Sequence, residues 1–286
     1  MKSIKRKTLL YKSGVEYADY GLNHVEGCSH GCKFPCYAYI MKKRCGIVKT
    51  YKEWIEPKIV ENALELLDKE LPRLKNKINN VFLCFSTDPF MYKQPEVQKL
   101  TLRILEKLNR ENLRAILITK GVYPKELTNT KKFNKNNDYG STIVWESDKY
   151  REKFEPGASP ISMRIRALKA LSEAGLKTWI SMEPYPTPNI ARQNVENILN
   201  KISFVDKIIF GKWNYNQYVS KQPNYKEFYN EMSSIVIDFC RRKSIDVHIK
   251  EGTISQNPIG KNKFILEDYL KQNSLCYSGS LIFNIN

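Results

Sequence analysis

Three cysteines stand close together near the start of the chain, at Cys28, Cys32 and Cys36. Thiolates are soft ligands that suit iron–sulfur clusters, zinc and copper. Three of them leave one metal position without a nearby protein ligand, whereas a structural zinc site closes with four ligands. A 4Fe–4S cluster held by three cysteines keeps one iron open, and an open iron can chelate a substrate or cofactor. The pattern therefore favours such a cluster, with a zinc site closed by His30 or Cys45 as the alternative.

The elements that must position these cysteines alternate between strands and helices. Apolar runs predict strands at 21–27, 79–86, 114–120, 140–147, 177–184, 206–214 and 246–252. Amphipathic spacing predicts helices at 56–75, 97–110, 161–175, 189–202 and 223–242. Strands that alternate with helices in this way form βαβ units and a parallel sheet. We expect an α/β fold, a partial (β/α)6 TIM-like barrel, with a full barrel or a Rossmann-like open sheet as alternatives.

The expected barrel also predicts where ligands bind. We expect a basic N-terminal segment at 1–20, the barrel at 21–215, and a helix/strand extension packed on it at 216–286. In both barrels and open parallel sheets, ligands lie at the carboxyl ends of the strands. The strand ends therefore supply further candidate site residues: Ser86, Thr87, Asp88, Lys120, Glu146, Ser147, Glu183, Lys212, Trp213 and Asn214.

The overall charge is strongly positive, with 47 Lys and Arg against 30 Asp and Glu and a formal net charge of +17. Such a charge attracts polyanions, so nucleic acid is a candidate partner. An AT-rich genome, which enriches Lys, Asn, Ile and Tyr, would explain the same excess. Seven cysteines, an odd number, do not fit a secreted disulfide framework. No apolar run reaches membrane-spanning length, and the basic N-terminus lacks a signal-peptide core, so we expect no membrane partner and a cytoplasmic location.

The segment from Asn23 to Ala38 resembles the cluster loop of radical S-adenosylmethionine (SAM) enzymes, and within them the spore photoproduct lyase-like branch. That branch has a pattern like Asn-x-x-x-Gly-Cys-x-His-Gly-Cys-x-Tyr-Cys-Tyr-Ala. The matching positions are Asn23, Gly27, Cys28, His30, Gly31, Cys32, Cys36, Tyr37 and Ala38. The branch usually has two residues before its third cysteine, whereas this chain has Lys33, Phe34 and Pro35. We expect the extra residue to be absorbed locally, with Pro35 fixing the bend.

Further segments resemble the same family in the same order, so that the likeness covers residues 20–190. They are the Thr-Asp-Pro of Cys84–Phe90, the Thr-Lys of Ile118–Gly121 and the Glu-Pro-Gly of Phe154–Arg164. The resemblance implies a partial barrel of the radical SAM type, with a 4Fe–4S cluster and SAM as cofactors. It implies SAM contacts at Ser86, Thr87, Asp88, Lys120, Ser147, Glu155, Arg164 and Tyr37.

The resemblance also suggests what each contact would do. Lys120 is expected near the SAM carboxylate, where a positive point charge suits an anion. Arg164 is expected at a cofactor carboxylate as well, because Arg binds carboxylates in a bidentate manner. Asp88 is expected near the methionine part of SAM, Glu155 at a ribose or amine, and Tyr37 beside the cluster or adenine. Each residue also has a purely structural interpretation as a turn residue, a solvated charge or core packing.

The implied reaction is reductive cleavage of SAM followed by abstraction of a hydrogen atom from a substrate, in a lyase- or transferase-like reaction. The implied partner is a flavodoxin or ferredoxin-type electron donor. We expect a nucleic-acid substrate, in lesion repair or modification, and Tyr150, Tyr185, Trp213 and Tyr215 could stack on its bases. The alternatives are a peptide or small-molecule substrate, or a non-catalytic zinc-bearing nucleic-acid-binding protein.

Cys84 bears on the choice of reaction. Photoproduct lyases carry a hydrogen-donating cysteine at the end of the second strand, but alignment on Asp88 puts Phe85 at that position. Neighbouring residues of a strand face opposite sides, so we expect Cys84 in the core. Genuine spore lesion repair is correspondingly disfavoured.

Overall fold

The computed structural model describes residues 1–14, 18–33, 36–255 and 263–274. Its main sheet has eight strands in the order β11-β10-β9-β8-β7-β6-β3-β2. Their bounds are β2 (Leu10–Lys12), β3 (Tyr20–Leu22), β6 (Asn80–Leu83), β7 (Arg114–Thr119), β8 (Asp138–Thr142), β9 (Lys177–Tyr185), β10 (Lys207–Lys212) and β11 (Asp246–Ile249). A three-stranded sheet has the order β1-β5-β4, with bounds β1 (Lys2–Ile4), β5 (Lys58–Val60) and β4 (Val25–Glu26).

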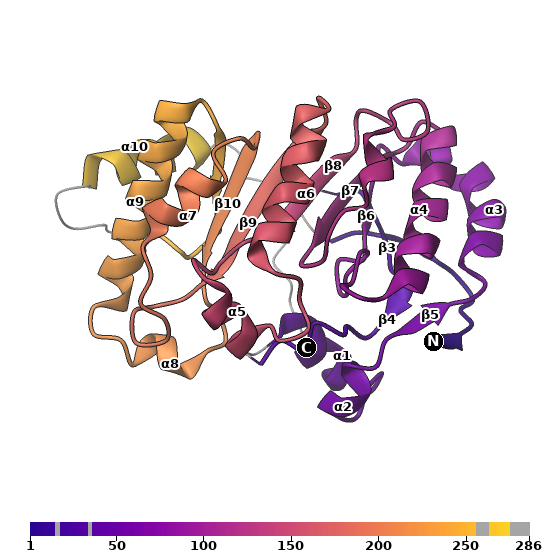
Figure 1. The fold of residues 1–286 in the computed structure, drawn as a ribbon, viewed down its shortest axis with the longest axis horizontal. Helices are drawn as coiled ribbons and strands as arrows, with labels where there is room; N and C mark the ends of the chain where they lie inside the picture. The colour runs from indigo at the N-terminus through magenta and orange to yellow at the C-terminus, as the bar shows by residue number, and fades with distance from the viewer. Residues whose placement is uncertain (15–17, 34–35, 256–262, 275–286) are drawn as a thin grey trace.

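Helices connect the strands of the main sheet and flank it (Figure 1). Their bounds are α1 (Tyr37–Arg44), α2 (Tyr51–Trp54), α3 (Ala63–Leu74), α4 (Pro95–Arg110), α5 (Asp148–Phe154), α6 (Ile161–Glu173), α7 (Val195–Lys201), α8 (Gln217–Ser220), α9 (Tyr225–Lys243) and α10 (Lys263–Ser274). Two short 3-10 helices are η1 (Lys75–Lys77) and η2 (Lys125–Thr128).

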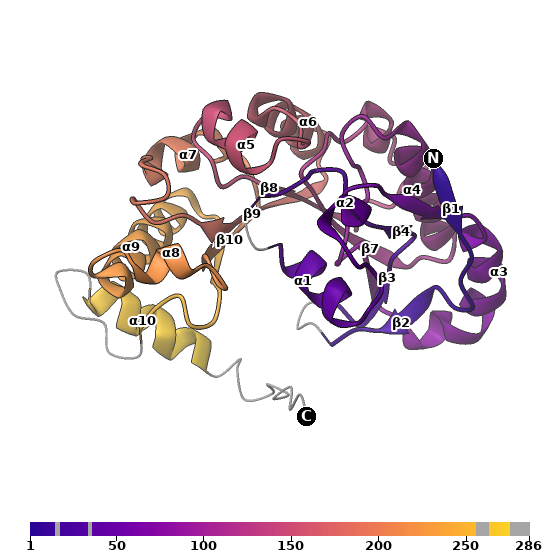
Figure 2. The same ribbon diagram turned by 90° about the horizontal axis from the view of Figure 1, so that it is seen from below.

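The strand order identifies the architecture. Strands β3 and β6 to β11 are parallel neighbours, and their order in the sheet follows their order in the chain. A Rossmann-like sheet reverses its strand order at a switch point, so that alternative is wrong. The sheet curves with its connecting helices on the outside, and β11 and β2 form its two edges (Figure 2). The α/β partial barrel expected from the sequence is confirmed.

Alternation along the strands separates two apolar layers. Leu83 of β6 belongs to the large core between the sheet and its helices. The preceding Phe82 faces the other way and joins Ile116 and Trp179 in a smaller cluster on the inner face. Gly140 of β8 leaves room for this cluster, because a Cβ atom there would lie 2.3 Å from the Trp179 ring.

Two predicted N-terminal elements differ from the observed ones. The strand predicted at 21–27 is divided into β3 and β4, which belong to different sheets. The helix predicted at 56–75 begins only at Ala63, because β5 takes the preceding residues into the small sheet. In both cases the correction comes from strand pairing with residues far away in the chain, which a local pattern does not contain.

Two further boundaries were wrong. The strand predicted at 140–147 is β8, which begins earlier and ends at Thr142. The helix predicted at 189–202 is only α7, because the side chain of Asn194 accepts the backbone N–H of Glu196 and begins the helix there. The helix predicted at 161–175 matches α6 closely.

The two N-terminal strands and the last strand, β11, all take part in the sheets. Strand β1 pairs with β5, β2 pairs with β3, and β11 pairs with β10. The proposed boundaries at 1–20, 21–215 and 216–286 stay predictions, and 275–286 lie outside the described residues. In the part of the chain that the structure describes, no helix combines the length and apolarity needed to cross a bilayer.

Candidate active site

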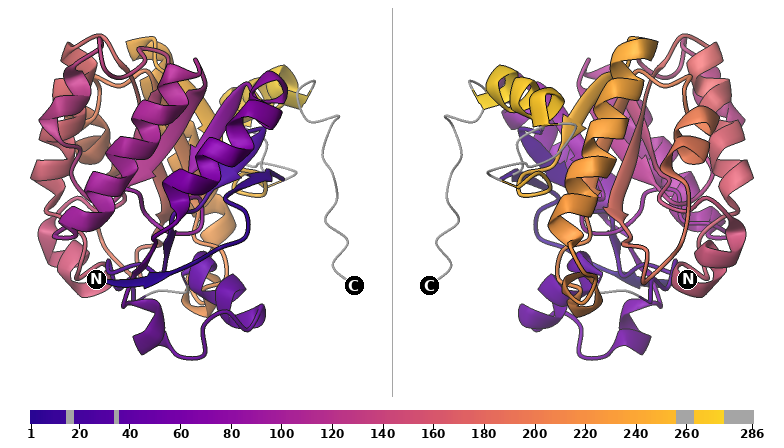
Figure 3. Two further views of the ribbon diagram at one scale, coloured as in Figure 1. Left: turned by 90° about the vertical axis from the view of Figure 1, so that its right-hand side faces the viewer. Right: turned by 90° about the vertical axis from the view of Figure 1, so that its left-hand side faces the viewer.

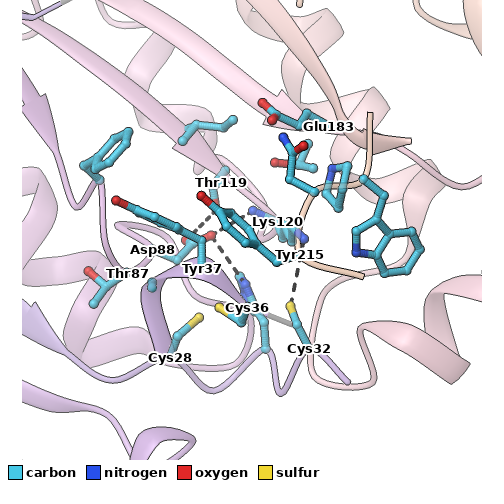
Figure 4. A pocket seen from close by; sticks show the side chains of 18 of the residues that line it. Cys28, Cys32, Cys36, Tyr37, Thr87, Asp88, Thr119, Lys120, Glu183 and Tyr215 are labelled. Carbon is cyan, nitrogen blue, oxygen red and sulfur yellow. Dashed lines mark hydrogen bonds and ion pairs between the residues drawn. The ribbon is translucent and has the colours of Figure 1, made fainter. Parts of the chain in front are cut away.

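A cavity of about 480 Å³ opens at the carboxyl ends of the parallel strands, where the sequence predicted ligands to bind. Its size falls in the range of about 300–1,000 Å³ common for small-molecule sites. Figure 4 shows the three cysteines on one side and Glu183 on the other. The lining residues come from the cysteine loop and from the ends of the strands: Cys28, His30, Cys32, Cys36, Tyr37, Ala38, Phe85, Thr87, Asp88, Ile118, Thr119, Lys120, Thr142, Glu183, Pro184, Lys212, Trp213, Asn214, Tyr215 and Lys250.

Backbone contacts hold the cysteine loop against its neighbours. The N–H of Cys28 donates to the carbonyl of Trp54 at 2.8 Å, and the hydroxyl of Tyr51 donates to the carbonyl of Cys32 at 2.8 Å. The N–H of Gly157 donates to the carbonyl of His30 at 2.9 Å. Helix α2 and the Glu-Pro-Gly turn therefore brace the loop from two sides. The predicted bend at Phe34 and Pro35 lies outside the described residues.

The donor set fits an iron–sulfur cluster better than a closed zinc site. Among the described residues, no three His, Cys, Asp or Glu side chains converge as a single metal ion requires. In a 4Fe–4S cluster each thiolate binds its own iron, so the sulfurs surround a cage instead of meeting at one point. Cys28, Cys32 and Cys36 are unpaired thiols on the wall of one cavity, which suits that arrangement.

Neither of the two residues expected to close a zinc site is placed to do so. His30 is engaged by other residues, and Cys45 does not line the cavity. Nδ1 of His30 lies 3.4 Å from Oδ2 of Asp88, and Nε2 accepts the backbone N–H of Tyr92 at 3.3 Å. His30 therefore orders the loop by joining it to Asp88 and to the backbone of Tyr92. Cys45 is exposed beyond the end of α1 and does not line the cavity.

Burial favours the neutral form of two of the thiols, those of Cys28 and Cys32. Burial raises the pKa of the Cys28 thiol, and the Asp88 carboxylate adds to the rise. Burial also raises the pKa of Cys32 to about 12, although the Lys120 ammonium acts against this. Because iron binds the thiolate, loading a cluster here must release these protons.

Asp88 organises the strand ends beside the cysteines. One carboxylate oxygen accepts the Thr119 hydroxyl at 2.7 Å and the backbone N–H of Phe90 at 2.9 Å. The other accepts the backbone N–H of Lys120 at 2.8 Å. The side chain is almost fully buried but lines the cavity. Asp88 thus ties the end of β7 to the Thr-Asp-Pro turn, and the turn interpretation of this residue is correct.

Lys120 is held by a buried group of three charges. Its Nζ lies 2.6 Å from Oε1 of Glu155, whose other oxygen accepts from Nη1 and Nη2 of Arg164, each at 3.2 Å. Glu155 is 0% exposed and Arg164 1%. Burial acts to raise the pKa of Glu155, but Lys120 and Arg164 outweigh it and lower the pKa to about 2. Lys120 Nζ also lies 3.9 Å from the Sγ of Cys32, so the group ends at the cysteine loop.

The structure gathers only some of the predicted SAM contacts at the cavity. Tyr37, Thr87, Asp88 and Lys120 line it (Figure 4). The four others do not line it: Ser86, Ser147, Glu155 and Arg164. Glu155 and Arg164 lie behind Lys120, and Ser147 is exposed where α5 begins, because β8 ends earlier than predicted.

Cys84 is in the core, as predicted. It is 0% exposed, and its Sγ lies 3.4 Å from Nδ1 of the buried His24. The next residue, Phe85, lines the cavity and is 38% exposed. The one-residue offset from the photoproduct lyase pattern thus turns the sulfur away from the cavity.

The wall opposite the cysteines includes residues that sequence reasoning missed. Lys250 follows β11 directly, and its side chain and that of Glu183 both pack against Gly211. The strand-end rule could have found Lys250, but the last strand was predicted to continue to 252. Thr119 and Thr142 also line the cavity, and the strand-end rule missed them because the strands were predicted to end later, at 120 and 147.

Fold and site together define a class: open parallel barrels with a three-cysteine loop at the carboxyl ends of their strands. Residues 22–202 match the family model described as the Radical SAM superfamily. The chain belongs to this superfamily, and the match supports an enzyme.

Curated relatives share sequence over part of the chain. Uncharacterized protein ORF301 of Acidianus two-tailed virus is 26% identical over 204 residues, 66% of this chain and 64% of that protein. Uncharacterized protein MJ0683 of Methanocaldococcus jannaschii is 28% identical over 181 residues, 63% of this chain and 66% of that protein. The chain thus spans just under two thirds of the length of these relatives.

Solved structures share the fold. Spore photoproduct lyase complexed with dinucleoside spore photoproduct has a TM-score of 0.59 at 15% identity, covering 86% of this chain and 81% of that one. A mutant of the same lyase with bound AdoMet and dinucleoside spore photoproduct has the same TM-score and identity, covering 80% of that chain. At this identity the likeness establishes a fold like that of spore photoproduct lyase.

Proposed function

We propose that the protein is a radical SAM enzyme that holds a 4Fe–4S cluster on Cys28, Cys32 and Cys36 and binds SAM in the adjoining cavity. The observation that carries the proposal is the shared cavity wall: all three thiols line it together with the Lys120 ammonium. Membership of the superfamily supports both cofactors.

When bound, the cluster would supply one electron that breaks the sulfonium C–S bond of SAM, releasing methionine and leaving a 5′-deoxyadenosyl radical that takes a hydrogen atom from the substrate. The chain contributes binding, orientation and exclusion of water. Lys120 offers a fixed positive charge to the SAM carboxylate. Asp88 positions the backbone of that lysine, and Glu155 holds its side chain.

These contacts revise the roles expected from the resemblance. We propose direct SAM contacts for Tyr37, Thr87 and Lys120, which line the cavity, where the ion pair with Glu155 fixes the Lys120 ammonium. Asp88 lines the cavity too, but its oxygens already accept several hydrogen bonds, so we assign it mainly to positioning. Glu155 and Arg164 act through Lys120, and we propose no SAM contact for the two serines, Ser86 and Ser147.

Anaerobic reconstitution with iron and sulfide tests the proposal. The reconstituted protein should be brown and should convert SAM to 5′-deoxyadenosine when dithionite is added. Lys120→Met should bind SAM more weakly while keeping the cluster. A colourless protein that carries zinc, or a brown protein that forms no 5′-deoxyadenosine, would refute the proposed chemistry.

We propose nucleic acid as the substrate, with a peptide or small molecule as the alternative. The net charge of +17 supports this, as do the exposed rings of Tyr37, Phe85 and Tyr215 on the cavity wall. Rings of this kind stack on unpaired bases. Tyr215→Ala should weaken binding of a single-stranded oligonucleotide. The matched control is Tyr218→Ala, an exposed tyrosine outside this cavity, and equal effects of the two substitutions would argue against base stacking in the cavity.

A further inference from the structure

The helical segment that follows the cysteine loop has an unusual charge pattern. No Asp or Glu occurs between Glu26 and Glu53, which is the longest stretch of the chain without an acidic residue. Six Lys and Arg residues lie within it: Lys33, Lys42, Lys43, Arg44, Lys49 and Lys52. The excess is therefore local, beyond the general basicity of the chain.

Five of these cations are exposed. Lys42 is half-buried beside Arg6 and Glu26 and is left out. We call the remaining five the α1–α2 basic surface: Lys33, Lys43, Arg44, Lys49 and Lys52, all exposed. Within the described ranges none of them forms an ion pair, and Lys43 lies over the ring of Tyr39 instead, 5.9 Å from its centroid. The charge of this surface is thus available to a partner.

The segment that carries the surface projects from the body of the protein. Helix α1 has no buried residue. Figure 3 shows α1 and α2 extending beyond the carboxyl ends of the strands, away from the helices that cover the sheet. A helix with no fully buried residue leaves much of its surface free to contact another molecule.

The same segment is joined directly to the cysteine loop. Cys36 is the N-cap residue of α1, and Tyr51 at the start of α2 donates to the carbonyl of Cys32. Lys43 and Arg44 follow Cys36 by seven and eight residues, which is about 10–12 Å along a helix axis. A partner on the basic surface would therefore lie close to the three thiols without entering the cavity, because none of the five cations lines it.

We propose that the α1–α2 basic surface docks an acidic one-electron carrier protein of the flavodoxin or ferredoxin type. This rests on the proposed function, in which the cluster must gain one electron for each SAM cleaved while the carrier loses one. Electron tunnelling weakens steeply with distance, so the carrier must dock beside the cysteine loop. Complementary charge would steer an acidic carrier to this surface and raise its association rate.

Nucleic acid is the competing occupant of a basic surface. A strand that presents a base to the cavity would need the rings of Tyr37, Phe85 and Tyr215, which lie on the cavity wall. The cations of the basic surface lie outside that wall. Their position favours a partner that approaches the cysteine loop from outside over one that enters the cavity.

Charge reversal on the surface tests the docking. The variant is Lys43→Glu/Arg44→Glu/Lys49→Glu, and the matched control is Lys177→Glu/Arg241→Glu/Lys243→Glu. The control residues are exposed at the amino-end side of the sheet, where β9 begins and α9 ends, and make the same change in net charge. Each reconstituted protein is mixed anaerobically with reduced flavodoxin at low salt, and bleaching of the cluster is followed. Photoreduced deazaflavin, a small uncharged donor, is measured in parallel.

The expected result is a fall of about ten-fold or more in the flavodoxin rate for the surface variant only. The rate with deazaflavin should stay within about two-fold of wild type, and the difference should shrink at high salt. An equal fall in the control, or no fall in the surface variant, would overturn the docking site. So would a loss of oligonucleotide binding in the surface variant with an unchanged flavodoxin rate.

Two further measurements distinguish a failure of docking from a failure to load the cluster and from a failure of the proposed function. Should the surface variant fail to take up a cluster, Lys43→Gln/Arg44→Gln/Lys49→Gln replaces it, and an unchanged flavodoxin rate there refutes the proposal. Failure of the proposed function shows differently, as a wild-type protein whose reduced cluster forms no 5′-deoxyadenosine with either donor.

Discussion

The buried charges around Glu155 make a stability prediction that follows from the geometry. Glu155→Gln keeps the shape of the side chain but removes the negative charge between Lys120 and Arg164. Arg164 is 1% exposed and cannot reach water by a small movement, whereas Lys120 lies at the cavity wall. Removing one partner from such a buried group costs about 3–5 kcal/mol, because an uncompensated charge remains. We expect the lower part of that range, because the ammonium of Lys120 can turn toward the cavity.

Thermal unfolding of the metal-free protein measures the effect. For a chain of this size roughly 2 °C corresponds to 1 kcal/mol, so the lower part of this range means that Glu155→Gln should lower the melting temperature by about 6–8 °C. The matched control is Glu65→Gln, which breaks an exposed pair with Lys69 across one helical turn and should leave the melting temperature unchanged. If both variants have the melting temperature of the wild type, the negative charge of Glu155 does not stabilise the fold and the reasoning is wrong.

Three more predictions concern the cysteine loop and the core. Cys32→Ala should abolish iron uptake on reconstitution, whereas Cys45→Ala should retain it. Equal iron contents in the two variants would show that Cys32 is not a ligand of the cluster. Gly157→Ala should also lose iron, because its Cβ would lie 2.1 Å from the carbonyl oxygen of Ser29; normal loading would show that the loop can shift at no cost. Burial lowers the pKa of His24 from 6.5 to about 3. Between these two pH values the side chain is protonated in the unfolded chain and neutral in the folded one. Stability should therefore fall by about 1.4 kcal/mol per pH unit as the pH drops from 6.5 toward 3, and His24→Gln should flatten this dependence in urea titrations.

Much of the fold could be predicted from the sequence because the parallel strands are short, continuous and apolar. The strands around Phe82, Ile116 and Ile180 are buried on both faces, and such runs stand out without knowledge of their partners. Boundaries were wrong where a distant partner decides them. Val25 pairs with Ile59 in the small sheet, and nothing near either residue in the chain indicates this.

The residues of the candidate site were also predicted only in part. The strand-end rule placed Asp88, Lys120 and Glu183 at the cavity because carboxyl ends of parallel strands share one edge. The family resemblance, which supplied Glu155 and Arg164, could not distinguish a residue that faces the cavity from one that lies behind it. Glu155 and Arg164 were expected at the cofactor, yet both are buried with Lys120 in front of them.

The cysteine loop and its neighbours show what the sequence determines and what the tertiary structure determines. Three thiols within nine residues, followed by the Thr-Asp-Pro, Thr-Lys and Glu-Pro-Gly segments, were enough to indicate the superfamily and the type of cofactor, because ligand chemistry depends on residue type and local spacing. Only the tertiary structure decided that His30 is engaged with Asp88 and that Glu155 positions Lys120. The physical reason is that these contacts join residues 58 and 35 positions apart, so they exist only once the barrel has brought its strand ends together.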